Sequence, residues 1–133
     1  MNKIFFTFLT GLSILSASCE LFQNRPSNTA QSFHKNLCDG NIDETLKTLS
    51  SSNPMPQEML RMGFAAGIRE CKEKGGFKSL EVAEEKVDGE MAFVKGKVKY
   101  GNDSEEPVNM KMYKEGGAWK IVWQTPQERE KQK

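Results

Sequence analysis

The first half of the chain carries apolar residues at helical spacing. Three segments show this pattern: residues 28–39, a short stretch over 42–49, and residues 57–74. Gly40 follows the first segment and Gly75 follows the third, as is common where helices end. The third segment has two apolar stripes, Leu60, Phe64, Gly67, Ile68 and Cys71 on one and Met55, Met59, Met62 and Ala66 on the other. The second stripe predicts that this helix is buried over a wide angle.

From Phe77 onward the apolar positions alternate, which predicts strands. Four strands are expected, at residues 78–87, 90–100, 107–114 and 118–124, with Asp88-Gly89 as a two-residue hairpin turn between the first two. Their inward positions are expected to be Leu80, Val82, Ala92, Val94, Gly96, Val98, Tyr100, Val108, Met110, Met112, Trp119, Ile121 and Trp123. Helices followed by an antiparallel meander indicate an α+β fold, with three N-terminal helices packed on one face of a curved four-stranded sheet.

Residues 1–18 have the features of an export signal. Lys3 precedes an apolar run from Ile4 to Leu15, which is too short for a transmembrane helix, and small residues follow. The segment from Leu15 to Cys19 resembles the cleavage box of bacterial lipoproteins, in which the signal is cut before the cysteine and the cysteine is acylated. The box usually has leucine three residues before the cysteine, where this chain has Ser16. Ordinary signal cleavage at the same bond is the alternative.

The resemblance implies a lipid anchor at Cys19, with membrane lipid as its partner, at the bacterial cell envelope. Glu20 follows Cys19 in place of the aspartate that retains some lipoproteins at the inner membrane, so the outer membrane is favoured. The expected organisation is then a lipoprotein signal peptide at 1–18, a lipid-anchored tether at 19–27, one α+β domain at 28–125 and a flexible charged tail at 126–133.

Length, charge and composition exclude several classes of function. The 133 residues suit one domain. Lysine and arginine total 19 against 18 acidic residues, and loss of residues 1–18 removes Lys3 and no acid. A neutral mature chain argues against nucleic-acid binding. The single histidine excludes a multi-histidine metal site, HExxH and GxSxG motifs are absent, and neither a cofactor nor a metal is expected.

The odd number of cysteines is explained if Cys19 carries lipid. Cys38 and Cys71 then remain, each on the apolar face of its predicted helix. Outside the cytoplasm such a pair is expected to oxidise. A disulfide between them would stabilise the fold by about 3.8 kcal/mol in the chain-entropy model. The alternative is two buried free thiols that act as small apolar side chains.

Three short motifs resemble the nuclear transport factor 2-like (NTF2-like) superfamily, also called the cystatin-like cone. Ala30-x-x-Phe33 and Asp39-Gly40-Asn41-x-Asp43 resemble its opening helix pair, and Gly116-Gly117-x-Trp119-x-Ile121 resembles its final hairpin. A subgroup of unknown function consists of small bacterial lipoproteins, and residues 27–124 resemble a member of it. The resemblance implies a cone-shaped pocket between the sheet and the helices.

Flexible methionines could line such a pocket for an apolar ligand. The candidate lining residues are Met59, Met62, Phe64, Met110, Met112 and Trp119. Core filling explains the same residues without a ligand.

Enzymes of the superfamily place an Asp/His or Tyr/Asp pair in the cone, but the inward positions here are nearly all apolar, so no catalytic residue is assigned. His34 is interpreted as a half-exposed structural residue; a lone general base is the alternative.

The expected function is therefore a non-enzymatic, lipid-anchored domain of the cell envelope that binds a small apolar ligand or an envelope protein. Two alternatives remain open. One is an isomerase-like or dehydratase-like enzyme with an apolar cone-shaped pocket, and the other is a structural or immunity-type envelope lipoprotein.

Overall fold

Three helices precede four strands in the structure, a computed structural model that describes residues 24–123. The elements are α2 (Pro26–Cys38), α3 (Ile42–Lys47), α4 (Gln57–Glu73), β1 (Phe77–Asp88), β2 (Met91–Tyr100), β3 (Glu105–Glu115) and β4 (Ala118–Val122). The order and type of all seven elements agree with the prediction. The predicted signal, most of the tether and nearly all of the charged tail lie outside the described residues. Within residues 24–123, no helix is long and apolar enough to cross a membrane.

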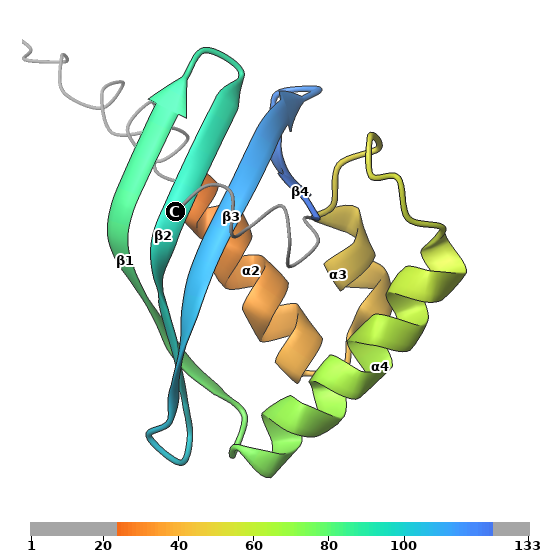
Figure 1. Cartoon of the computed structure of the whole chain (residues 1–133), viewed down its shortest axis with the longest axis vertical. Helices are drawn as coiled ribbons and strands as arrows, with labels where there is room; N and C mark the ends of the chain where they lie inside the picture. The colour runs from red at the N-terminus through yellow and green to blue at the C-terminus, as the bar shows by residue number, and fades with distance from the viewer. Residues whose placement is uncertain (1–23, 124–133) are drawn as a thin grey trace, which may run out of the picture.

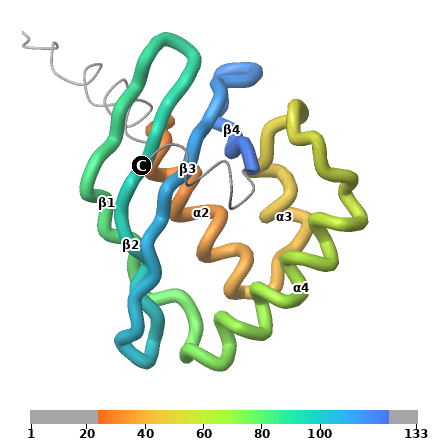
Figure 2. The backbone as a smooth tube through the Cα atoms, viewed as in Figure 1, coloured from red at the N-terminus to blue at the C-terminus, as the bar shows by residue number. Residues whose placement is uncertain are grey.

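The four strands form one antiparallel sheet in the order β1-β2-β3-β4. Figure 1 shows α2 lying across one face of this sheet, with α3 and α4 farther out on the same side. The fold is thus α+β, with three helices on a four-stranded antiparallel sheet. Figure 2 shows the backbone leaving α4 at the lower end of the sheet, where β1 begins and the β2–β3 turn lies.

The chain enters the domain at the opposite end of the sheet. The side-chain amide of Asn24 donates to the carbonyl of Gly117 at 2.8 Å, and the indole N–H of Trp119 donates to the carbonyl of Asn24 at 3.2 Å. Helix α2 then begins at Pro26, two residues earlier than predicted. Proline suits a first helical turn, because its fixed φ fits the helix and its missing N–H would have no intrahelical partner there.

The core lies between α2 and the two central strands. Most inward positions predicted for β2, β3 and β4 are buried, while Gly96 and Trp123 are partly exposed. The buried ones are Ala92, Val94, Val98, Tyr100, Val108, Met110, Met112, Trp119 and Ile121. Strand β1 differs in part from the prediction, since Leu80 packs against the core but Val82 is 41% exposed. β1 is an edge strand with a bulge between Val82 and Glu84, so its side chains lie at the margin of the helix layer.

Two local features of β2 depend on glycine. The hairpin turn consists of Gly89 and Glu90, one residue later than predicted, because Asp88 pairs with Met91 and Gly89 supplies the positive φ of +60°. Farther along β2, a Cβ on Gly96 would lie 2.0 Å from the carbonyl oxygen of Glu81. Only glycine therefore lets β1 cross so closely at its bulge.

Helix α4 buries one face only. Leu60, Phe64 and Cys71 point into the core, whereas Met59 is 57% exposed and Met62 is 75% exposed. The prediction of a wide buried angle is therefore wrong. The cause is the position of α4 at the outside of the helix layer, where it packs on α2 and α3 and has no layer above it.

Candidate functional site

A cavity of about 340 Å³ opens between α2, α4 and the end of the sheet where β2 passes into β3. Its inner part is aromatic. The rings of Phe33 and Trp123 line it with centroids 5.8 Å apart, and Phe64 packs against both at 5.7 and 5.6 Å. Such edge and tilted contacts hold the three rings in place. The cavity therefore has a firm apolar floor.

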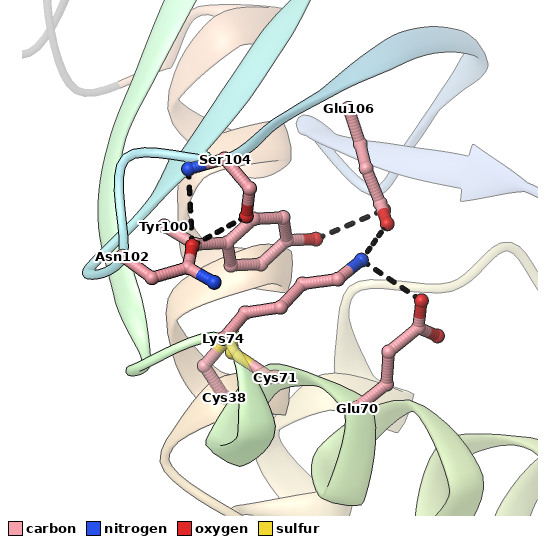
Figure 3. A network of polar contacts seen from close by, with 8 residues as sticks. All are labelled: Cys38, Glu70, Cys71, Lys74, Tyr100, Asn102, Ser104 and Glu106. Carbon is pink, nitrogen blue, oxygen red and sulfur yellow. Dashed lines mark hydrogen bonds and ion pairs between the residues drawn. A yellow bond between two sulfur atoms is a disulfide. The ribbon is translucent and has the colours of Figure 1, made fainter.

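The rim of the cavity is polar. The hydroxyl of Tyr100 on β2 donates to Oε2 of Glu106 on β3 at 3.1 Å. Lys74, just after α4, donates to the other oxygen of Glu106 and to Glu70 at 2.9 Å. Figure 3 shows the Lys74 ammonium between the two carboxylates, with its chain along the Tyr100 ring. Glu70, Tyr100 and Glu106 all line the cavity.

A glycine-rich junction brings this rim together. The backbone N–H of Gly101 donates to the carbonyl of Gly76 at 2.9 Å, and that of Asn102 donates to the carbonyl of Lys74 at 2.9 Å. A Cβ on Gly101 would lie 2.2 Å from the carbonyl oxygen of Gly75. The turn after α4 thus rests directly on the β2–β3 turn, which places Lys74 beside Tyr100 and Glu106.

The rim groups shift one another's pKa values. The hydrogen bond from Lys74 lowers the pKa of Glu106, and the hydrogen bonds to Glu106 and Glu70 raise the pKa of Lys74. Burial, together with the nearby charge of Glu106, raises the pKa of Tyr100 to about 12. At neutral pH the rim therefore contains ionised Glu106, charged Lys74 and a neutral phenol.

His34 lines the same cavity from α2. The residue is partly exposed, as predicted, but its Nε2 atom is buried and has no hydrogen-bond partner among the described residues. Burial lowers the pKa of His34 to about 4, although the charge of Glu106 opposes the shift. The imidazole is therefore neutral at pH 7, and its Nε2 atom is buried in the cavity wall without a partner among the described residues.

Comparisons with known proteins show which solved structures have a similar fold. No protein-family model matches the chain, and none of the curated proteins matches it. The crystal structure of a "putative NTF2-like transpeptidase" from Campylobacter jejuni is similar, with a TM-score of 0.66 and 19% identity over 74% of this chain and 98% of that one. A SEC-C motif containing protein from Rhodopseudomonas palustris is similar with a TM-score of 0.52 and 15% identity, over 74% of this chain and 76% of that one. The chain has an NTF2-like fold.

The NTF2-like domain places its two predicted bridge cysteines at disulfide-bonding distance. The Sγ atoms of Cys38 and Cys71 are 1.99 Å apart, and their Cα atoms are 5.5 Å apart. The pair joins the end of α2 to the last turns of α4, and both residues line the cavity. The cross-link thus forms part of the cavity wall.

Of the predicted pocket residues, only Met110 lines this cavity. Phe64 packs behind its floor, while Met112 and Trp119 are buried in the core away from it. Met59 and Met62 point outward from α4 and are wrong as lining residues, for the reason given above. Cys19 lies outside the described residues.

Sequence patterns do not identify the polar groups that line this cavity. The alternation predicts an inward Tyr100 but indicates no role for it, and the polar residues before Pro107 predict a connection at Glu106. The pairing of Glu106 with Val98 shows that β3 already includes it, so it faces inward in phase with Val108. That phase was the signal available in the sequence. Among residues 24–123, no group of three His, Cys, Asp or Glu side chains could hold a metal ion.

Proposed function

We propose that this NTF2-like domain binds a small, mainly apolar molecule in the cavity described above and does not transform it chemically. The observation that carries the proposal is the combination of an aromatic floor, made by Phe33 and Trp123, with a few convergent polar groups at His34, Tyr100 and Glu106. Ligand sites in proteins have this composition, because apolar walls provide affinity and a few polar groups orient the ligand.

The protonation states favour binding over catalysis. General acids and bases work best when their pKa lies near the working pH. His34 has a pKa of about 4 and Tyr100 a pKa of about 12, so neither exchanges protons readily at neutral pH. An isomerase-like or dehydratase-like enzyme is the alternative, and it would require substrate binding to bring one of these pKa values back toward 7.

We further propose that the domain is held at the bacterial cell envelope by acylated Cys19, with the outer membrane favoured. The pattern of residues 1–19 supports an export signal and a lipid site. Cys38 and Cys71 at disulfide distance also support an oxidising compartment. Mass spectrometry of the native protein tests this: an unmodified Cys19 thiol would rule out the anchor.

Two glycines on α4 provide a matched test of the cavity. Gly67 lines it, whereas a Cβ on Gly63 would meet nothing within 4 Å. The Gly67→Leu variant should fill the cavity, while Gly63→Leu should leave it open. Native protein and both variants would be purified from the envelope, denatured, and analysed for released small molecules by mass spectrometry. A compound released by the native protein and Gly63→Leu, but not by Gly67→Leu, is the expected result. Equal release from all three would contradict the proposal.

An envelope protein partner is the second candidate. Met59 and Met62 support it, because both are exposed three residues apart on α4. Crosslinking in intact cells would compare native protein with a Met59→Gln, Met62→Gln double variant. Loss of one specific crosslinked species would favour a partner at this helix face. A structural or immunity-type role would also require such a partner. An unchanged pattern would argue against a partner there.

A further inference from the structure

The charges at the rim of the cavity do not balance. Glu70 and Glu106 share a single ammonium, that of Lys74. The described residues that line the cavity include no lysine or arginine. Lys74 contacts the lining residues Glu70 and Glu106 but does not itself line the cavity. With both carboxylates ionised, the rim carries an excess of one negative charge. A cation entering the cavity would meet a favourable potential there, and an anion would meet an unfavourable one.

The Lys74 contacts also show that this place suits an ammonium group. Its Nζ lies between two carboxylates and 5.0 Å from the centre of the Tyr100 ring. Carboxylates and an aromatic face are the groups that stabilise organic ammonium ions in proteins. Each carboxylate has more lone pairs than one lysine uses, so a second ammonium can share the pair.

The inside of the cavity offers an anion no compensation. His34 is the nearest basic group in the lining, and its imidazole is neutral at pH 7. The surrounding Phe33 and Trp123 rings accept apolar or aromatic groups, and Trp123 can also contact a cation through its face. The cavity is thus apolar and aromatic at its inner end and negative at its mouth.

We propose that the cavity selects small organic cations, with an apolar or aromatic body against Phe33 and Trp123 and an ammonium bound by Glu70 and Glu106. This inference rests on the proposed binding function and adds the chemical class of the ligand. Free amines and the amine ends of larger molecules share this chemistry.

Three probes of similar size and different charge test it: phenethylamine, phenethyl alcohol and phenylacetate. Binding to the purified full chain would be followed by tryptophan fluorescence, because Trp123 lines the cavity. The amine should bind about tenfold more tightly than the alcohol, corresponding to about 1.4 kcal/mol, and phenylacetate should bind more weakly than the alcohol. Equal affinities for the amine and the alcohol would overturn the inference but leave the binding function standing. Binding of none of the three would overturn both.

Variants that remove one negative charge test which carboxylates cause the preference for the amine. Glu106→Gln and Glu70→Gln should each reduce the ratio of the affinity for the amine to the affinity for the alcohol, because each removes one negative charge at the rim. Glu70 is more exposed than Glu106, so Glu70→Gln keeps the test valid if Glu106→Gln folds poorly. Glu73→Gln, exposed on the same helix and outside the cavity, is the matched control and should change neither affinity. A folded Glu70→Gln variant that keeps the full preference for the amine would overturn the assignment of the carboxylates.

Discussion

Tyr100 and Glu106 lie diagonally across the β2–β3 hairpin, with the phenolic hydroxyl donating to Oε2 of the carboxylate at 3.1 Å. The two residues belong to neighbouring strands, and Lys74 reaches the other oxygen of Glu106 from the end of α4. This contact therefore joins the sheet to the helix layer at the mouth of the cavity. The pKa of Tyr100 should report on this contact.

Replacing Glu106 should make Tyr100 easier to ionise. In Glu106→Gln the pKa of Tyr100 should fall from about 12 toward its ordinary value of 10.0, because the negative charge that opposes the phenolate is gone. The fall should be partial, since burial is the larger cause of the shift. Tyrosinate absorbance at about pH 11, measured in a Tyr113→Phe background, should rise in the variant. The same absorbance with and without Glu106 would contradict this account of the rim.

His34 should make the domain less stable in mild acid. Its pKa is lowered from 6.5 to about 4 in the folded protein, so the unfolded chain binds more protons between these values. The contribution of neutral His34 to the free energy of unfolding is fully present above pH 6.5 and is lost as the pH falls toward 4. The loss should be about 2–3 kcal/mol between about pH 7 and 4.5. Glu106 is the charged group that acts on His34, and it reduces the effect.

The contribution of His34 can be separated from that of the carboxylates. Urea unfolding at both pH values would be compared for native protein and His34→Gln. The variant should lose less stability on acidification, by about the same 2–3 kcal/mol. Parallel losses in the two proteins would show that His34 is protonated equally in the folded and unfolded states.

Removing the link between Cys38 and Cys71 should cost about 3–4 kcal/mol of unfolding free energy, because the unfolded chain gains the freedom of a loop with a sequence separation of 33. The Cys38→Ser, Cys71→Ser double variant would be compared with native protein in urea, before and after reduction. Reduction should bring native protein close to the variant and leave the variant unchanged. A double variant as stable as the oxidised protein would exclude a stabilising bridge.

Gly96→Ala and Gly63→Ala should shift stability in opposite directions. The new methyl at position 96 would meet the Glu81 carbonyl at 2.0 Å, so β1 must move, at a cost of about 1–3 kcal/mol. At position 63, on an exposed part of α4 with open space, alanine should stabilise the helix by up to about 1 kcal/mol. Thermal unfolding of the two variants provides the comparison. A Gly96→Ala variant as stable as native protein would mean that β1 does not approach β2 this closely.

Alternation and helical spacing were sufficient to predict the seven elements and the burial of β2 and β3. The approach of Cys38 to Cys71 needed the cysteine count as well, with Cys19 assigned to lipid. They did not predict Met59 and Met62 correctly, because an apolar stripe shows which residues share a helix face but not whether a second layer covers it. Glu106 was missed for a related reason. A charged residue next to a turn predicts a loop. Only the fold shows that the helices leave this end of the sheet open and that Lys74 lies beside Glu106.

The attachment of Asn24 to the β3–β4 turn fixes where the chain enters the domain relative to the mouth of the cavity. Asn24 is bound at Gly117, whereas Glu106 lies at the start of β3, so chain entry and cavity mouth occupy opposite ends of the sheet. A chain anchored through Cys19 would have only residues 20–23 between the anchor and Asn24, so that the two Cα atoms are at most about 18 Å apart. The bilayer would then lie beyond the closed end of the domain. Its ligand would arrive dissolved in the aqueous phase and would not be extracted from the membrane beneath.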